Sequence, residues 1–246
     1  MPTPFYHLHL SQELLVEESC SPLWQDEPGA FYLGNIAPDA QNVAGQSRES
    51  THFFEVPMRD ATPAWEVMFN QYPSLIHILT PAQRAFLAGY ICHLAVDQMW
   101  ITDIFEPVFV DEAKWEKPRD RFFIHNILRI YLDELDRPAL ASNGVGASLK
   151  KAQPDHWLPF LNDAALSHWR DFVAEQLVEG GAAQTIEVFA KRMKRPPSDF
   201  ESLLQSPTQM TQRVFQLVST DALENFRLKA FTRSREILAD YARRAN

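Results

Sequence analysis

The chain has 246 residues, of which 46% are hydrophobic and 12% aromatic, and this is enough to bury the core of one large domain. A formal net charge of -9 and a pI near 5.4 argue against a protein that binds nucleic acid through the phosphate backbone, because no basic excess is present to displace counterions. The two cysteines, Cys20 and Cys92, are too few for a disulfide framework and indicate a reducing compartment.

The first residues, Met1 to Phe5, do not combine a basic region with an apolar core, as a secretion signal would. No stretch of the chain approaches 18 uninterrupted apolar residues, so a transmembrane helix is not predicted. We therefore expect a cytoplasmic protein without a membrane span.

The N-terminal part predicts one helix followed by a long loop. Apolar residues recur near helical spacing from Phe5 to Glu18, and this helix carries His7. His9 lies two residues further on, so it points away from the face of His7. The segment from Ser21 to Arg59 is rich in Pro, Gly, Asn, Asp and Ser, which favours an ordered loop with about one helical turn. A loop of this length in a compact domain is often functional.

A central helix is predicted by its start signal. Short helices over Pro63 to Asn70 and through Ile76 precede the sequence Thr80-Pro81-Ala82-Gln83. Thr80 suits the N-cap, Pro81 the first helical position and Gln83 the second half of a capping box. The apolar run that follows predicts a helix to about Phe105.

This central helix places His93 and Asp97 four residues apart, which puts both on one helix face. Apolar residues surround them, and a charged aspartate in such company is costly unless a cation or a hydrogen-bonding partner meets it. The pair is therefore a candidate ligand pair for a metal ion. The structural alternative is a core histidine that hydrogen-bonds to its neighbour.

A connector over Pro107 to Pro118 and a further helix over Arg119 to Leu135 are predicted next. The apolar face of that helix is broad enough for the helix to be largely buried, and His125 lies on it. Arg129 follows one turn later.

The remaining chain also reads as helical. Strand signals are scarce throughout, so we predict an all-α fold with a single domain over residues 1–246. Whether the extension over 139–246 completes the same core or forms a lid is left open. Its predicted helices span Leu158 to Val178, Ala182 to Lys194, Asp199 to Leu204, Thr208 to Val218 and Asp221 to Arg244.

The order of the motifs over residues 5–136 resembles the zinc-dependent phospholipase C family, which includes the all-helical bacterial zinc phospholipases and the catalytic domain of alpha-toxin. The resemblance extends more distantly to zinc single-strand nucleases. The motifs that carry it are His7-Leu8, Gly34 to Asp39, Thr51-His52-Phe53, Gly89 to Asp97, and His125. It implies an all-helical fold with a cluster of three zinc ions in a cleft between helices.

The resemblance also implies a ligand set. The first metal would be held by Asp39, His52, His93 and Asp97. A second would share Asp97 and take His7, although the family's N-terminal tryptophan ligand is replaced here by Met1. A third would take His125.

At the third site the sequence departs from the family. Asp103 stands where the family has a histidine, and Arg129 stands where it has a glutamate. An arginine there repels a cation, and Arg129 could instead supply the charge of the missing metal and pair with a substrate phosphate.

The chemistry of the first ligand set can be argued without the family. Two imidazoles and two carboxylates suit a borderline divalent ion such as zinc, manganese or iron, and their protonation should weaken binding below about pH 6. Such an ion polarises a phosphoryl oxygen and lowers the pKa of its bound water, which is the chemistry of a hydrolase. The family's counterpart of Asp39 also acts as a general base, which implies that role here.

Two functions are therefore weighed. The first is a metal-dependent hydrolase that cleaves a phosphodiester of lipid-like or other small-molecule type by a phospholipase C-like reaction. The alternative is a binding or regulatory module that keeps the helical fold with a reduced metal site. A His-Asp phosphohydrolase is disfavoured because the chain has no His-Asp dipeptide. The substrate and the oligomeric state are not defined by the sequence.

Three tryptophans have either a functional or a structural interpretation. Trp65, Trp100 and Trp115 could line an apolar cleft, although core packing is the ordinary role of such residues.

Overall fold

The computed structural model describes residues 1–17, 22–77, 80–178 and 180–244. Helices make up the regular structure of these residues and no strand occurs among them, so the all-α prediction is confirmed. Glu18, where the first helix was predicted to end, lies outside the described residues, and so does Cys20. Across the described helices, none combines the length and apolar character that a membrane crossing requires.

The N-terminal half supplies the elements around the candidate site. In chain order they are α1 (Pro4–Val16), α2 (Pro22–Gln25), α3 (Pro28–Ile36), the 3-10 helix η1 (Ala37–Ala40), α4 (Gln41–Ala44), α5 (Glu49–His52), α6 (Ala64–Gln71), the 3-10 helix η2 (Pro73–Ile76) and α7 (Pro81–Trp100).

The second half begins with a π-helical continuation of α7. Its elements are η3 (Ile101–Val110), the 3-10 helix η4 (Glu112–Lys114), α8 (Asp120–Ser142), α9 (Val145–Lys150), α10 (Asp163–Glu175), α11 (Thr185–Met193), α12 (Pro197–Leu204), α13 (Pro207–Met210), the π-helical turn η5 (Thr211–Phe215) and α14 (Thr220–Arg244).

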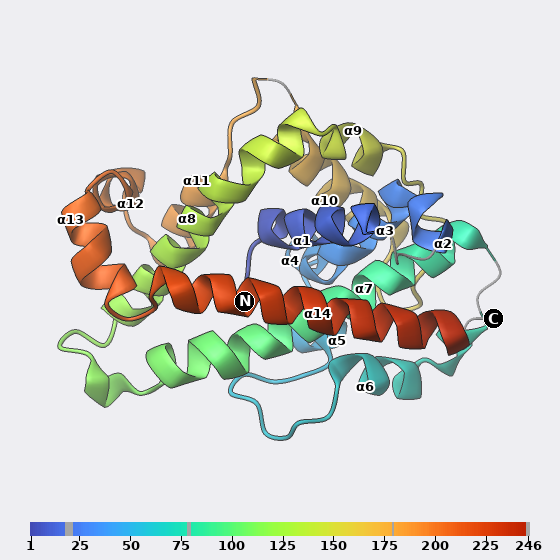
Figure 1. The fold of residues 1–246 in the computed structure, drawn as a ribbon, viewed down its shortest axis with the longest axis horizontal. Helices are drawn as coiled ribbons and strands as arrows, with labels where there is room; N and C mark the ends of the chain where they lie inside the picture. The colour runs from blue at the N-terminus through green and yellow to red at the C-terminus, as the bar shows by residue number, and fades with distance from the viewer. Residues whose placement is uncertain (18–21, 78–79, 179, 245–246) are drawn as a thin grey trace.

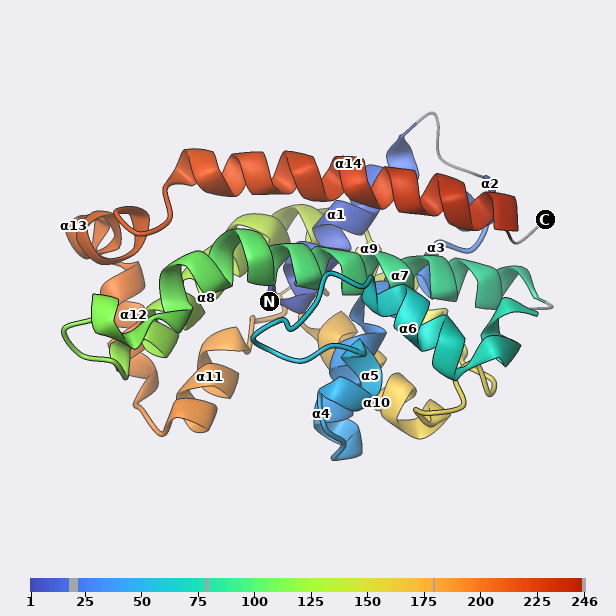
Figure 2. The ribbon, with the colours of Figure 1, turned by 90° about the horizontal axis from the view of Figure 1, so that it is seen from below.

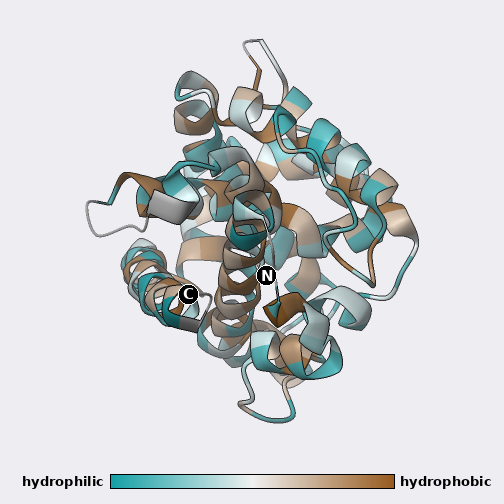
Figure 3. Cartoon of the chain, turned by 90° about the vertical axis from the view of Figure 1, so that its right-hand side faces the viewer, coloured by the Kyte–Doolittle hydropathy of each residue, from teal (hydrophilic) through white to brown (hydrophobic). Residues whose placement is uncertain are grey.

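α7 is the central element of this assembly. It packs against α3 and α6, and α14 lies beside it along the long axis of the molecule (Figures 1 and 2). Hydrophobic residues gather on the helices in the middle of the molecule, and hydrophilic residues lie on the outer loops and helices (Figure 3). All but a few residues of α7 from Ala85 to Trp100 are buried, His93 and Asp97 included.

The prediction of a long loop over Ser21 to Arg59 was wrong. The segment contains α3 and several short helical turns, and its residues Gly29 to Ile36 are all buried. Pro28 stands in the first turn of α3, where a missing N–H costs nothing. Glycine lowers helix propensity, but here tertiary packing outweighs that penalty.

α3 and α7 approach each other closely at two glycines. A Cβ atom on Gly89 would lie 2.2 Å from the carbonyl oxygen of Phe31, and one on Gly34 would lie 1.9 Å from that of Phe86. Only glycine lets the two backbones touch at these positions. The contact sets the distance between α3 and the face of α7 that carries His93.

The boundaries of the central helices differ from the predicted ones in part. The Thr80 capping box is confirmed, since the Gln83 backbone N–H donates to the Thr80 hydroxyl at 3.2 Å. The prediction of a connector over Pro107 to Pro118 is wrong in its first part, because η3 continues through Pro107 to Val110. α8 likewise runs past Pro138 to Ser142. Burial of Leu140 fixes that last turn, so tertiary packing overrides the proline.

A buried carboxyl connects the start of α1 to two later helices. Asp133 on α8 accepts hydrogen bonds from the hydroxyl of Thr3 and, at 2.6 Å, from that of Thr185. Burial raises the pKa of Asp133 to about 7, against the effect of these two donors. The N-terminal segment that leads to His7 is thereby held against α8.

We predict that Asp133 makes the protein less stable as pH rises. The unfolded carboxyl titrates near 3.8 and the folded one near 7. Between these values the unfolded state binds fewer protons, so stability falls by a few kcal/mol from about pH 4 to pH 7. In Asp133→Asn this loss should be absent, and urea unfolding of both proteins across this range measures it. Parallel pH profiles would contradict the assignment.

Gly89→Ala tests the close contact of α3 and α7. The added methyl group has to displace backbone, so we expect a loss of stability of about 1–3 kcal/mol or more, measured by urea unfolding. A change within the roughly 0.5 kcal/mol of an ordinary surface substitution would show that the two helices separate without strain.

Candidate metal centre

The centre of the site is the carboxylate of Asp97, which is buried and faces three imidazole rings. Its Oδ1 lies 3.3 Å from Nε2 of His7, and its Oδ2 lies 3.4 Å from Nε2 of His52 and 3.6 Å from Nε2 of His93. The three histidines come from α1, α5 and α7, and all of them are buried. Segments far apart in sequence thus bring their ligand atoms to one point.

Backbone carbonyls orient two of the imidazoles. Nδ1 of His93 lies 2.7 Å from the carbonyl oxygen of Asn35, and Nδ1 of His52 lies 3.2 Å from that of Arg48. A carbonyl only accepts, so each Nδ1 carries the proton and each Nε2 presents a lone pair. The two Nε2 atoms are 3.4 Å apart. Two lone pairs this close to each other and to a carboxylate oxygen repel unless a proton or a metal ion binds to them.

His7 completes this side of the cluster. Its ring stacks on that of His93, with centroids 4.0 Å apart and an angle of 15° between the planes. Nε2 of His7 faces Oδ1 of Asp97 at 3.3 Å without the geometry of a hydrogen bond, and Nδ1 of His7 has no hydrogen-bond partner among the described residues. Buried polar atoms without partners are costly, and a metal ion would satisfy two of these atoms at once.

Asp39 lies at the edge of the cluster. Its Oδ1 is 3.8 Å from Nε2 of His52, and its side chain is 23% exposed. The hydroxyl of Thr51 donates to the carbonyl oxygen of Pro38 at 2.8 Å, which fixes the turn of Asp39 against α5. Asp39 therefore faces both the buried imidazoles and the protein exterior.

Two groups of potential ligands result, and His93 belongs to both. One consists of His7, His93 and Asp97, and the other of Asp39, His52 and His93. Within each group the ligand atoms all lie within 4.8 Å of one another. Five of the six residues predicted as ligands are thus brought together.

The protonation states suit a metal ion. Burial lowers the pKa of His7 to about 4, and burial also lowers that of His52, so both are neutral at pH 7. Burial alone would raise the pKa of Asp97, but the three imidazoles hold it well below its usual value. Burial opposes protonation of His93 as well, yet Asp97 and Asp39 raise its pKa. The ionised carboxylate of Asp97 beside the neutral imidazoles of His7 and His52 suits a metal ion, which would displace the proton that His93 can carry.

A small cavity of about 70 Å³ adjoins Asp39. Arg129, Arg192 and Asn42 also line it. The guanidinium of Arg129 stacks over the ring of Phe189 at 4.5 Å, and its Nη1 donates to Asn126 at 3.2 Å. Burial lowers the pKa of Arg129 to about 10, so it stays protonated at neutral pH. Asp39 thus has the imidazoles on one side and a cavity that contains two arginines on the other.

Residues 4–100 match a family model described as zinc dependent phospholipase C. The match supports assignment of these residues to the zinc-dependent phospholipase C family. The match includes all five clustered residues and ends before His125 and Arg129. It confirms the resemblance inferred from the motifs. No curated protein and no solved structure matches the chain significantly.

The zinc-dependent phospholipase C resemblance also implied a third site at His125, and the structure places that residue elsewhere. Its Nε2 accepts a hydrogen bond from the indole of Trp100 at 3.0 Å, and the rings of Phe105 and Phe109 lie 4.9 Å away. Burial holds the pKa of His125 well below its usual range. His125 is in neither ligand group, and its neutral ring packs among aromatic side chains.

Sequence reasoning missed Arg48, because the loop expected around it hid its relation to His52. Its Nη2 lies 3.1 Å from Oδ2 of Asp97, and its guanidinium stacks over Phe54 at 4.3 Å. Arg48 precedes His52 by four residues, and the two side chains meet the same carboxylate. An arginine four residues before a candidate ligand was the available signal.

We predict that Arg48 competes with a metal ion for Asp97. Arg48→Met removes a positive charge beside the donors, so zinc should bind about tenfold more tightly in calorimetric titrations of metal-free protein. Arg59→Met is the matched control, since Arg59 is 81% exposed and pairs with Glu55. Unchanged or weaker zinc binding in Arg48→Met would show that the guanidinium supports the ligand set instead.

Proposed function

We propose that this protein is a metal-dependent hydrolase of phosphodiesters, acting on a lipid-like or other small-molecule ester in the manner of a phospholipase C. The observation that carries the proposal is the position of Asp39. Its carboxylate belongs to a metal-ligand group and also lines the cavity that contains Arg129. Nucleophile activation and phosphate recognition would therefore take place on adjacent sides of one residue. The cytoplasmic location expected from the sequence belongs to the same proposal.

The ligand set we propose is His7, Asp39, His52, His93 and Asp97. Their donor types, two carboxylates and three imidazoles, fit zinc or another divalent transition metal such as manganese or iron. The atoms of His7 and Asp97 that lack a hydrogen bond among the described residues support this fit. The hydrogen bond from Trp100 gives His125 a structural role in this proposal.

When bound, the metal supplies a Lewis acid that polarises a phosphoryl oxygen and lowers the pKa of water. Asp39 is the more exposed of the two carboxylates in the set and accepts the proton of the attacking water. Arg129 binds the phosphate oxygens and stabilises the negative charge that grows on them. Attack of water on phosphorus then breaks the bond to the leaving alkoxide and yields a phosphomonoester and an alcohol.

The test combines metal content with hydrolysis. Protein purified without chelator should contain at least one equivalent of zinc, manganese or iron by elemental analysis and should hydrolyse bis(4-nitrophenyl) phosphate or phospholipid in vesicles. Asp97→Asn removes the central charge, so we expect this variant to lose the metal and to hydrolyse the ester at least about 100-fold more slowly. Asp199→Asn is the control, because Asp199 is exposed on α12 and pairs with Arg195.

Two further variants separate the proposed roles. Asp39→Asn should lower kcat more than it raises KM, and Arg129→Met should raise KM, because one residue moves a proton and the other binds phosphate. Absence of metal after zinc is added back at neutral pH would contradict the hydrolase. Bound metal without hydrolysis of either ester would favour the alternative, a binding or regulatory module with a reduced metal site.

A further inference from the structure

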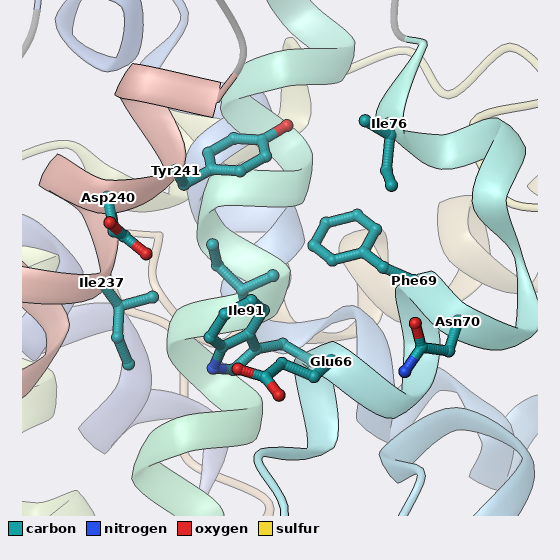
Figure 4. A pocket seen from close by; sticks show the side chains of 9 residues that line it. Glu66, Phe69, Asn70, Ile76, Ile91, Ile237, Asp240 and Tyr241 are labelled. Carbon is teal, nitrogen blue, oxygen red and sulfur yellow. The ribbon is translucent and has the colours of Figure 1, made fainter.

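A second cavity, of about 380 Å³, lies between α6, α7 and α14 (Figure 4). It is separate from the metal centre, because Ile91 of α7 lines it whereas the ligands of α7 are His93 and Asp97. Residues two apart on an α-helix point about 200° apart. The cavity is therefore on the back of the helix that carries the metal ligands.

The walls of this cavity are apolar and partly aromatic. The rings of Phe69 and Tyr241 are nearly parallel, at 12°, with centroids 6.3 Å apart, and the Trp65 ring lies edge-on to Phe69 at 6.4 Å. The floor is buried, whereas Ile76 at the rim is 52% exposed. The apolar and aromatic residues are Trp65, Phe69, Ile76, Ile91, Ile237 and Tyr241.

The charges at this cavity are all negative. Glu66 of α6 and Asp240 of α14 both line it, and Figure 4 shows the carboxylate of Glu66 below Ile91 and that of Asp240 to its left. Asp240 also accepts a hydrogen bond from Arg243 of its own helix at 2.9 Å. Glu66 forms no ion pair within the described part of the chain, and no described basic residue lines the cavity. The charged groups that line the cavity therefore disfavour an anion and favour a cation.

Aromatic faces and carboxylates attract the same kind of ligand. A ring face carries negative charge density and attracts ammonium groups, and a nearby carboxylate adds to that attraction. A cavity of this volume, lined mainly by apolar groups with a few charged ones, is typical of sites for small molecules. The isoleucines would bury the carbon chain that carries such an ammonium group.

We propose that this cavity binds a small amphiphilic organic cation, an alkylammonium compound whose charged group lies against Glu66 and the aromatic rings and whose apolar part covers the isoleucines. This inference does not depend on the proposed hydrolase, because none of the residues in the cavity belongs to the metal groups.

Three probes with the same apolar part and different charge test this proposal by calorimetry on the full chain. They are 4-phenylbutyltrimethylammonium, 4-phenylbutanol and 4-phenylbutanesulfonate. We expect the cation to bind about tenfold more tightly than the alcohol and the anion to give no measurable binding. Equal binding of the cation and the alcohol would overturn the proposal and leave a purely apolar site. No binding of the cation would overturn it as well.

Variants locate the binding site. Glu66→Gln should weaken the cation about fivefold or more and leave the alcohol unchanged, whereas Glu187→Gln, at an exposed position of α11, should change neither. Phe69→Leu keeps an apolar side chain but removes the ring, so it should also weaken the cation. Thermal unfolding checks that each variant is folded.

Asp97→Asn separates this site from the metal centre. It should bind the cation like the unmodified protein, whether or not it hydrolyses phosphodiesters. Loss of cation binding in folded Asp97→Asn, together with unchanged binding in Glu66→Gln, would place the cation at the metal centre and overturn the proposal.

Discussion

The burial of one carboxylate constrains most of this structure. Asp97 lies in the centre of α7, and a charged group in such a place is tolerated only when polar groups compensate it. Three imidazoles and the guanidinium of Arg48 meet its two oxygens. These groups come from α1, from α7 itself and from the segment around α5, so each of those elements has to be held in place against α7.

Backbone packing and ligand chemistry are linked through the contact of α3 with α7. Because Gly34 and Gly89 have no side chain, the two backbones approach closely enough for the carbonyl of Asn35 to reach Nδ1 of His93. That hydrogen bond selects the tautomer whose Nε2 faces Asp97. A similar carbonyl contact, from Arg48, orients His52. The donor atoms are therefore oriented before any metal binds, which lowers the cost of binding.

The two sides of α7 differ in electrostatic character. On the metal side, Arg48 lies beside Asp97, and Arg129 lines the same cavity as Asp39. The proposed site can therefore hold a divalent cation and an anionic ester at the same time. On the other side, Glu66 and Asp240 border an aromatic cavity that no described basic residue lines. The first side suits a phosphate and the second suits an organic cation, and α7 separates them.

The sequence by itself determined the features that depend on local spacing. A helix places residues four apart on one face whatever surrounds it, so His93 and Asp97 were identifiable as a ligand pair and Thr80 as the start of their helix. The apolar periodicity predicted an all-helical chain. The order of His7, Asp39 and His52 along the chain indicated the family, which the match over residues 4–100 confirms.

Only the tertiary structure decided which distant groups meet. α3 was not predicted, because its glycines lower helix propensity and its stability comes from contact with α7, which local sequence does not encode. Arg48 reaches Asp97 across 49 positions of the chain, and Trp100 occupies the lone pair of His125. Such contacts depend on how whole helices pack. Most of the proposed ligands could therefore be predicted from spacing along the chain, whereas the residues that surround them depend on how the helices pack.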